Sequence, residues 1–338
     1  MAARRVRVGI VGATGLVGGE LLRVLEQRSL PLSELRVFAT GRSTGNVIRF
    51  RGEDLPLEEA APGVFADLDL AFFCAGADVA QALAPLAVAK GCVVVDKSSA
   101  FRRDPGVPLA VPEVNPQVLR GCPRIIASPN CSTIQLVVAI APLHRAAGLR
   151  RVVVSTYQSV SGTGREAVNE LKEQTRAVLA GGQASAGVYP HPIAFNLFPQ
   201  IEEFGADGYS REEVKLIEET RRILELPDLR ITATTVRVPV FVGHCAAVNV
   251  ELERSMSRAE AVQCLRAGPG IIVLEQDYPT PLLCQGRDEV FVGRVREDPS
   301  QDRGLDLWVA ADNLRKGAAT NAVQIAEFLL GEGQAACG

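Results

Sequence analysis

The first 130 residues alternate short apolar runs with segments of helical spacing. Val6–Val11 is an apolar run that ends in glycines, and leucines recur at a helical spacing in the segment Gly18–Leu25 that follows it. Four further apolar runs have the length of buried strands: Arg36–Ala39, Leu70–Cys74, Val93–Asp96 and Ile125–Ala127. Because strands separated by helical crossovers pair in parallel, this part predicts an α/β fold with a doubly wound parallel sheet.

From about Arg150 the runs become longer and the helices fewer. Two amphipathic helices are predicted, one over Arg165–Leu179 and one that opens with the capping-box pair Ser210 and Glu213. The second helix should bury Val214, Ile217 and Leu224. Clustered strands with few helices predict an α+β domain with a large mixed sheet. Its expected strands are Arg151–Tyr157, Arg230–Val242, Ala246–Leu252, Ile271–Leu274, Val290–Val295 and Leu305–Ala310.

Length and charge narrow the classes of function. A chain of 338 residues favours two domains. Its 36 Lys and Arg against 39 Asp and Glu give a formal charge of −3, without the basic patch that a nucleic-acid partner would need. The longest apolar runs, such as Ile134–Leu143, are too short to cross a membrane. No signal-peptide core follows Met1–Arg7.

The cysteines and histidines form no metal-binding pattern. Eight cysteines are scattered without a C-x-x-C pair, and the three histidines have no zinc-ligand spacing, so we expect no metal. Scattered cysteines in a chain without a secretion signal suggest reduced thiols and a cytoplasmic location. Most of them are expected to be core residues.

A glycine-rich turn lies between the first strand and the first helix. Such a turn lets backbone N–H groups approach a pyrophosphate at the helix N-terminus, as in Rossmann-type domains, although a structural turn without a ligand is the alternative. After the second strand, the segment Thr40–Gly45 holds Arg42 and Ser43 and no acid, which favours the 2′-phosphate of NADP; a solvated arginine is the alternative. The residues expected to contact the cofactor in the turn are Gly12, Thr14, Gly15, Leu16, Val17 and Gly18.

One cysteine differs from the others in its position. Cys131 follows a predicted strand and stands at the start of a predicted helix, Thr133–Arg145, whose dipole favours a thiolate. A packed core thiol remains the alternative. His244 lies in a glycine-containing turn between two strands and could supply an acid or base, or be a structural histidine.

Four polar residues can be interpreted either as ligand-binding groups or as ordinary structural or surface residues. Arg237 points away from the valines that alternate beside it, so its guanidinium could bind a carboxylate in two parallel hydrogen bonds, or it could be solvated. Gln158 ends a strand, where an amide can serve a ligand or the fold. Taken alone, Arg102 is typical of a solvated loop and Lys215 of a helix surface.

Seven segments in order along nearly the whole chain resemble aspartate-semialdehyde dehydrogenase. They are Gly12–Gly18, Asp96–Arg102, Val111–Asn115, Ser128–Thr133, Gln158–Gly162, Arg237–His244 and Asp312–Ala319. The resemblance implies a discontinuous NADP-binding Rossmann domain, residues 1–130 and 316–338, because the last helix, Gly317–Leu330, returns to it. Residues 131–315 would form a catalytic and dimerisation domain.

The resemblance also implies roles for single residues. Cys131 matches the nucleophile, His244 the acid/base and Gln158 the residue that orients the substrate. The substrate would be bound by Arg237 and by Glu212 or Glu213, with Glu213 preferred. Phosphate would be bound by Arg102 and Lys215. Further cofactor contacts would come from Ser161, Gly162 and Asn313.

The implied reaction converts L-aspartate-4-semialdehyde and inorganic phosphate to L-4-aspartyl phosphate through a cysteine thioester. In the cell it would run in reverse, toward lysine, threonine and methionine, in a homodimer or a pair of dimers. Two alternatives remain: another acyl-phosphate reductase, such as N-acetyl-glutamyl-phosphate reductase, whose cysteine segment differs from Ser128–Thr133, and a non-catalytic Rossmann protein that binds NADP.

Overall fold

The computed structural model describes residues 5–39, 41 and 45–331. The chain divides into two compact units. Unit 1 comprises Met1–Pro129 and Ala318–Gly338, and unit 2 comprises Asn130–Gly317. The chain therefore passes between the units after residue 129, where 130 was expected, and after residue 317, where 315 was expected.

Unit 1 is built on a seven-stranded sheet in the order β3-β4-β2-β1-β5-β6-β7. All neighbouring strands are parallel except the edge pair β3 and β4. The sequence did not predict this pair, because β3 is only four residues long and four of the seven residues of β4 are acidic. The strands are β1 Val6–Val11, β2 Leu32–Ala39, β3 Val47–Phe50, β4 Glu53–Glu59, β5 Leu70–Phe73, β6 Val93–Asp96 and β7 Ile125–Ala127.

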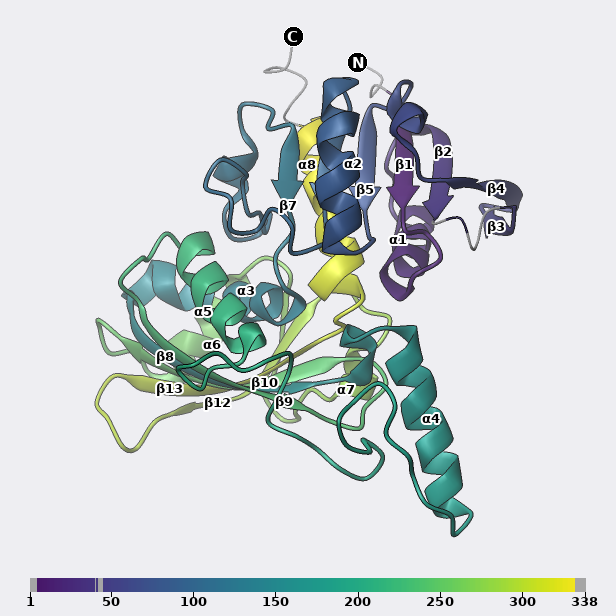
Figure 1. Ribbon diagram of the computed structural model, residues 1–338. Helices are drawn as coiled ribbons and strands as arrows, with labels where there is room; N and C mark the ends of the chain where they lie inside the picture. Colours follow the sequence, from purple (N-terminus) through teal and green to yellow (C-terminus); the bar gives the residue numbers. More distant parts are fainter. Residues whose placement is uncertain (1–4, 40, 42–44, 332–338) are drawn as a thin grey trace. The chain divides into compact units, whose positions relative to one another are not determined.

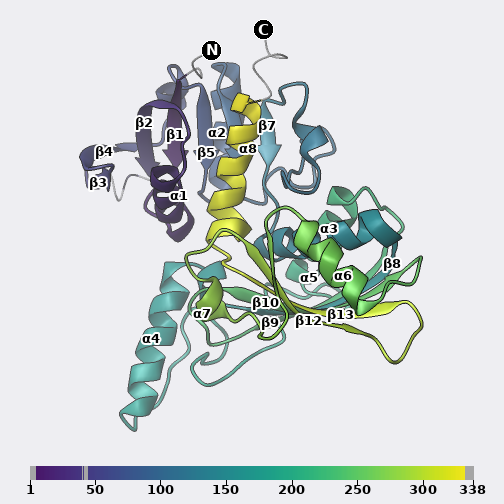
Figure 2. The ribbon, with the colours of Figure 1, turned by 180° about the vertical axis from the view of Figure 1, so that it is seen from behind.

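Helices cover both faces of this sheet. In Figures 1 and 2, α2 (Ala77–Ala89) lies on one face, and α1 (Leu16–Gln27) and α8 (Thr320–Gly331) lie on the other. Alternating side chains of β5 fill the two layers: Phe72 packs in the core under α1 and α8, and Phe73 packs in the core under α2. The predicted doubly wound sheet is confirmed.

Unit 2 contains a six-stranded mixed sheet in the order β11-β12-β13-β10-β8-β9. Helices α3, α5 and α6 lie on one face of it (Figure 1). The strands are β8 Leu149–Gln158, β9 Arg230–Arg237, β10 His244–Leu252, β11 Ile271–Leu274, β12 Val290–Glu297 and β13 Gly304–Ala311. The helices are α3 Cys131–Ala147, α4 Arg165–Leu179, α5 Arg211–Ile223, α6 Arg258–Ala267 and α7 Pro281–Cys284. The predicted mixed sheet is confirmed.

The strand directions place polar residues at one end of the sheet of unit 2. Strands β8 and β9 are parallel and end as partners at Gln158 and Arg237. The antiparallel strand β10 begins at His244, and its partner β13 ends just before Asp312. Strand β9 stops at Arg237, earlier than the expected Val242, because Pro239 in this segment has no N–H to donate to a neighbouring strand.

Helix α5 buries a different face from the one expected. Leu224 is buried as expected, but Val214 and Ile217 are only partly buried, and carboxylates take several inner positions. Two of these, Glu212 and Glu219, are 4% and 5% exposed, because main-chain and side-chain donors at the start of α3 bind them. The buried face consists of Glu212, Glu213, Leu216, Glu219, Thr220 and Ile223.

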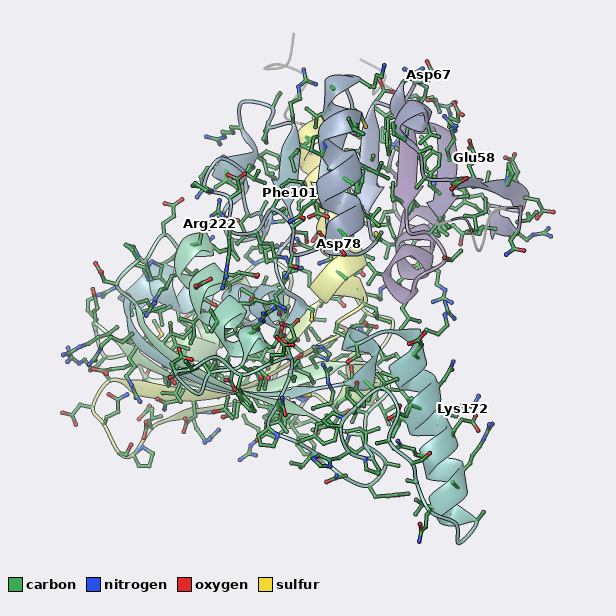
Figure 3. The ribbon with its side chains drawn as sticks, in the orientation of Figure 1. Glu58, Asp67, Asp78, Phe101, Lys172 and Arg222 are labelled. Carbon is green, nitrogen blue, oxygen red and sulfur yellow. The ribbon has the colours of Figure 1, made fainter. Side chains whose placement is uncertain are left out.

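The other amphipathic helix, α4, has its polar side in solvent. Lys172 points away from the helix in Figure 3, and the neighbouring Leu171 is buried. No helix in the described part of the chain is both long and apolar enough to cross a membrane.

Among the described cysteines, one departs from the expected reduced state. Six are free, namely Cys74, Cys92, Cys131, Cys245, Cys264 and Cys284. Cys122 is disulfide-bonded, which corrects the expectation that all thiols are reduced. Burial raises the pKa of Cys74, Cys92, Cys245 and Cys284 to about 12, as expected for core thiols.

Candidate active site

Cys131 is the first residue of helix α3, two residues earlier than the predicted start of the helix. Asn130 is the N-cap, and its side-chain oxygen accepts hydrogen bonds from the main-chain N–H groups of Ser132 at 2.9 Å and Thr133 at 3.4 Å. Cys131 is only partly buried. The positive end of the helix dipole therefore acts on a cysteine that is only partly buried, and such a dipole favours the thiolate form.

Buried carboxylates of helix α5 meet the start of α3. The side-chain amide of Asn130 donates to both oxygens of Glu212 at 3.0 and 2.9 Å, and its main-chain N–H donates to Glu219 at 2.7 Å. The amide of Gln158 also donates to Glu212, at 3.1 Å. Glu212 thus joins the residue before the candidate nucleophile to the end of strand β8.

Glu213 has a structural task. One carboxylate oxygen accepts the N–H of Ser210 at 2.7 Å, which completes the capping box of α5, and the other accepts the N–H of Thr235 at 2.8 Å. Lys215 Nζ lies 3.6 Å from the carboxylate of Glu212 and also forms an ion pair with Glu202. The geometry therefore brings Glu212, and not the preferred Glu213, together with Gln158.

Arg237 is buried without an acidic partner among the described residues. Arg237 is 5% exposed, and its Nη1 donates to the carbonyl of Ser159 at 2.6 Å. Its Nε has no hydrogen-bond partner in the described part of the chain. The ring of Tyr189 lies 5.9 Å from the guanidinium carbon. A buried guanidinium with an unused donor is suited to an anionic ligand.

His244 is fully buried beside Arg237. Its Nδ1 accepts a hydrogen bond from the main-chain N–H of Ser159 at 3.0 Å, and its Nε2 has no partner among the described residues. Burial, and then the charge of Arg237, lower the pKa of His244 to about 3. The imidazole is therefore neutral near pH 7.

Gly162 leaves room beside these two side chains. A Cβ atom at this position would stand 3.2 Å from Nη1 of Arg237 and 3.3 Å from Nε2 of His244. Nη1 of Arg237 and Nε2 of His244 consequently both lie beside Gly162. Ser161 and Asn313, two further expected cofactor contacts, bind each other, with Asn313 Nδ2 donating to Ser161 Oγ at 2.9 Å.

The glycine turn of unit 1 is too tight for side chains at two of its positions. Gly12 has a φ of +88°. A Cβ atom there would stand 2.9 Å from main-chain atoms of Cys74 and Ala75, which directly follow strand β5. A Cβ on Gly18 would stand 2.2 Å from the carbonyl oxygen of Gly12. Gly15 is the N-cap of α1 and has no side chain to bind the first N–H groups of the helix. The N-terminus of α1, which begins with Leu16 and Val17, can therefore bind an anion. Thr14 lies in the same turn.

Arg102 is expected to bind inorganic phosphate, and Arg42 and Ser43 are expected to bind the 2′-phosphate of NADP. Arg102, in unit 1, is half-buried and donates to the carbonyls of Ser128 at 3.0 Å and Lys97 at 2.8 Å. Arg42 and Ser43 lie outside the described residues. In the part of the chain that the structure describes, no group of three or more His, Cys, Asp or Glu could hold a metal ion.

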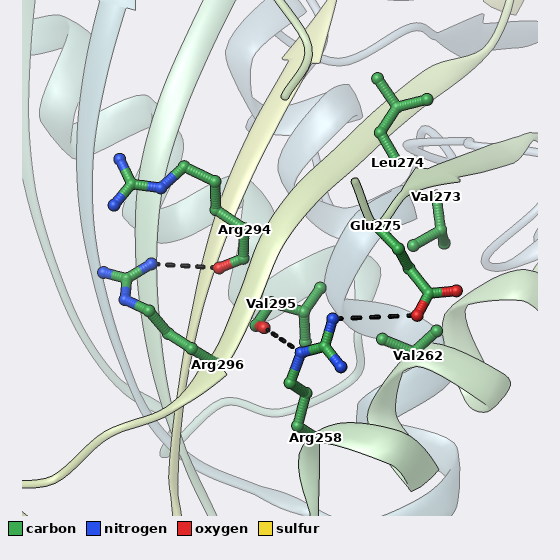
Figure 4. Close-up of a pocket in the computed structure, with 8 residues that line it drawn as sticks. All are labelled: Arg258, Val262, Val273, Leu274, Glu275, Arg294, Val295 and Arg296. Atoms are coloured by element: carbon green, nitrogen blue, oxygen red, sulfur yellow. Dashed lines mark hydrogen bonds and ion pairs between the residues drawn. The ribbon is translucent and has the colours of Figure 1, made fainter. Parts of the chain in front are cut away.

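Unit 2 also contains a separate cavity, and two of the arginines that line it are hydrogen-bonded to main-chain carbonyls. This cavity of about 160 Å³ lies between α6, β11 and β12 (Figure 4). Nε of Arg258 donates to the carbonyl of Val295 at 3.0 Å, and Arg296 Nη1 donates to the carbonyl of Arg294 at 3.1 Å. None of its lining residues belongs to the candidate active site. It is lined by Arg258, Val262, Val273, Leu274, Glu275, Arg294, Val295 and Arg296.

Comparisons with known proteins identify the family of the chain. Two family models match: the semialdehyde dehydrogenase NAD binding domain over residues 7–122 and the semialdehyde dehydrogenase dimerisation domain over residues 140–316. The aspartate-semialdehyde dehydrogenase of Aquifex aeolicus is 49% identical over 335 residues, which are 97% of this chain and 98% of that protein. The chain belongs to the aspartate-semialdehyde dehydrogenase family.

Further relatives of the family support the same conclusion. The Bacillus subtilis enzyme is 45% identical, with 96% of this chain and 98% of that protein covered. The crystal structure of aspartate semialdehyde dehydrogenase II complexed with ASA from Vibrio cholerae has a TM-score of 0.95 and 43% identity, with 97% of this chain and 99% of that chain covered. The resemblance and the expected oxidoreductase class are confirmed.

Some site residues escaped the sequence analysis. Asn130 is an N-cap type directly before Cys131, so capping preferences alone could have identified it. Glu212 was named only as the second choice, and it could have been preferred by elimination because the capping-box pattern already occupies Glu213. Ser159 and Glu219 act through contacts across the fold, for which the sequence carries no local signal.

Proposed function

We propose that this protein is an NADP-dependent and phosphate-dependent aspartate-semialdehyde dehydrogenase. It interconverts L-aspartate-4-semialdehyde and L-4-aspartyl phosphate through a thioester on Cys131. The observation that carries the proposal is the buried Arg237, without an acidic partner in the described part of the chain, at the sheet end that also carries Gln158 and His244. An anionic amino-acid substrate would supply the missing charge.

The substrate's α-carboxylate pairs with Arg237. Burying a guanidinium is costly unless a counter-charge accompanies it, and the unpartnered Nε leaves a donor for a carboxylate oxygen. A planar guanidinium can hold a carboxylate in a fixed orientation through two parallel hydrogen bonds. The aldehyde at the other end of the substrate would then be oriented as well.

The substrate's amino group is assigned to Glu212. This carboxylate is 4% exposed and accepts from Gln158 and Asn130, which fix its position. A buried carboxylate favours a cationic ligand group. Gln158 is the last residue of strand β8 and donates to Glu212. It is proposed to orient the substrate near the thiol.

Cys131 is proposed as the nucleophile. Its thiolate adds to the aldehyde carbon, the adduct loses hydride, and the product is a thioester that inorganic phosphate then cleaves. The thioester conserves the energy of the acyl phosphate and divides one difficult step into two easier ones. In the biosynthetic direction the same steps run backwards.

The cofactor is assigned to the glycine turn of unit 1. Gly12 and Gly18 leave the space that side chains would fill, and the N-terminus of α1 offers N–H groups to a pyrophosphate. A bound nicotinamide supplies the hydride acceptor. NADP in preference to NAD is proposed from Arg42 and Ser43, and the Candida albicans aspartate semialdehyde dehydrogenase structure with NADP, at 27% identity and a TM-score of 0.75, is consistent with it.

The remaining assignments follow the family resemblance. Arg102 and Lys215 are proposed to bind inorganic phosphate, and Ser161, Gly162 and Asn313 to contact the cofactor. The matched dimerisation domain supports a homodimer. The cytoplasmic location stays a prediction from the sequence.

A direct test is a matrix of steady-state rates. Purified enzyme is given aspartate semialdehyde or N-acetyl-glutamate semialdehyde, each with NADP or NAD, with and without phosphate. We expect rapid reduction of NADP only with aspartate semialdehyde and phosphate. Turnover of the acetylated substrate would favour the other acyl-phosphate reductase, and no turnover with any combination would favour the non-catalytic protein.

A further inference from the structure

Glu219 is a buried carboxylate of helix α5 to which the proposed function assigns no role. The residue is 5% exposed and lies, together with Leu216 and Ile223, on the buried face of α5, the helix that contacts α3 and β9. Burying a carboxylate is costly unless hydrogen bonds or opposite charges compensate for the lost water. For Glu219, one such compensating bond comes from the start of α3.

One carboxylate oxygen of Glu219 binds the residue that directly precedes the candidate nucleophile. Oε2 accepts the main-chain N–H of Asn130 at 2.7 Å, a length typical of a charge-assisted hydrogen bond. The main-chain carbonyl of Asn130 accepts the N–H of Ile134 at 3.0 Å, which is the first hydrogen bond within α3. Both polar groups of the Asn130 main chain are therefore bonded, and Cys131 follows directly.

The contacts of Glu219 and Glu212 with Asn130 differ in kind. Glu212 lies two helical turns before Glu219 on the buried face of α5, and it accepts the side-chain amide of Asn130 at 3.0 and 2.9 Å. A side-chain amide can rotate about its own bonds without moving the main chain. The bond to Glu219 acts on the main chain itself, so it restrains the backbone that carries Cys131.

We propose that Glu219 is a positioning residue for the nucleophile: its carboxylate holds the main-chain N–H of Asn130 and thereby fixes the sulfur of Cys131 for attack. This rests on the proposed function, in which the Cys131 thiolate adds to the aldehyde carbon. Because the attack needs a narrow range of distances, a displacement of about 1 Å can cost about 100-fold in rate. The substrate is proposed to bind Arg237 and Glu212, so Glu219 should affect turnover much more than substrate binding.

A carboxylate near a helix N-terminus can also act through its charge alone. It would then stabilise the positive end of the α3 dipole, and the position of its oxygens would matter little. The two roles predict opposite orders of activity in two variants. Glu219→Gln keeps the length of the side chain and an acceptor oxygen but loses the charge. Glu219→Asp keeps the charge but withdraws the oxygens by about 1.5 Å, the length of one C–C bond.

Steady-state kinetics of these variants test the positioning role. We expect kcat of Glu219→Gln to stay at least about 10-fold above that of Glu219→Asp, with KM for aspartate semialdehyde within about 3-fold of wild type in both. Glu219→Met, which has a similar volume but no strong acceptor, should resemble Glu219→Asp. Glu218→Gln, at the exposed neighbouring position, is the control and should keep wild-type kcat. Equal kcat values in the Gln and Asp variants, or a higher kcat with Asp, would overturn the proposal.

A second measurement needs no substrate. The sequence contains a single Pro-Asn pair, Pro129–Asn130, so ¹³C-carbonyl proline and ¹⁵N asparagine select the Asn130 N–H in an NMR spectrum. We expect this N–H to exchange with solvent slowly in wild type and Glu219→Gln, and at least about 10-fold faster in Glu219→Asp and Glu219→Met.

The exchange rates separate failure of the positioning role from failure of the proposed function. Rapid exchange of the Asn130 N–H in wild type, or equally slow exchange in all four proteins, would overturn the role of Glu219 whatever the enzyme catalyses. A slowly exchanging N–H that depends on Glu219, in a wild-type protein without turnover, would instead contradict the proposed function.

Discussion

Gly317 lies directly against Cys131: a Cβ atom at position 317 would stand 2.9 Å from the Cβ of the cysteine. The glycine belongs to a single turn of π-helix, Arg315–Ala319, that follows strand β13. Two carbon atoms at that distance cannot coexist without a shift of one backbone or the other. The position of the thiol therefore depends on the absence of a side chain at residue 317.

Gly317→Ala should impair catalysis more than folding. The new methyl group must displace Cys131, and a displacement of about 1 Å can cost about 100-fold in rate. We expect kcat to fall by at least about 10-fold. Gly331→Ala is the control, because nothing lies within 4 Å of a Cβ there, and it should retain wild-type kcat. Equal kcat for both variants would contradict the contact.

Asn130→Asp tests the link between the helix start and Glu212. Aspartate can still cap α3, but it replaces the donating amide by a second carboxylate opposite Glu212. We expect a loss of about 1–3 kcal/mol in the free energy of unfolding, as for a buried hydrogen bond to a charged group, and a clear fall in kcat. Ser257→Ala, at the cap of α6, should cost about 1 kcal/mol without loss of activity. A fully active Asn130→Asp would argue against the link.

The fold class was predictable from the sequence because its signals are local. Apolar runs, helical spacing and capping residues identified the parallel sheet of unit 1 and the mixed sheet of unit 2. The edge strands β3 and β4 were missed because β3 has only four residues and β4 is mostly acidic, and few side chains of either strand are buried. The inner face of α5 was misassigned because carboxylates occupy it, and only their tertiary partners make that burial favourable.

The candidate site could be predicted only in part, for a similar reason. Cys131, Gln158, Arg237 and His244 stand at the ends of strands or at the start of a helix, where the sequence pattern changes visibly. Ser159 acts through its main chain, which carries no mark of residue type. Its contacts with His244 and Arg237 depend on the register of β8, β9 and β10.

The pH dependence of stability should reveal the buried His244. Its pKa is lowered to about 3 in the folded state, so between that pH and about 6.5 the unfolded chain binds more protons and stability falls as the pH falls. We expect wild type to lose about 2 kcal/mol more than His244→Gln when the pH drops from 7 to 5 in denaturant titrations. Parallel losses in the two proteins would mean that His244 is not held neutral.

Arg237→Lys should reduce both substrate binding and turnover. Lysine keeps the charge but loses the planar pair of donors, so the substrate would no longer be oriented. We expect kcat/KM for the semialdehyde to fall by about 100-fold or more. Arg230→Lys, at the exposed beginning of the same strand, is the control and should remain within about 2-fold of wild type, because exposed ion pairs contribute little. A similar small effect at both positions would remove Arg237 from the substrate site.

The proposed thioester on Cys131 is tested most directly by a single turnover without phosphate. Enzyme is mixed with aspartate semialdehyde and NADP, the formation of NADPH is followed, and the mass of the chain is measured. We expect a burst of about one NADPH per site and an added acyl group on Cys131, because hydride loss precedes attack by phosphate. Cys131→Ser should give no burst and a kcat lower by at least about 10³-fold. A burst of normal size in Cys131→Ser, or a wild-type burst without acylation of Cys131, would contradict it.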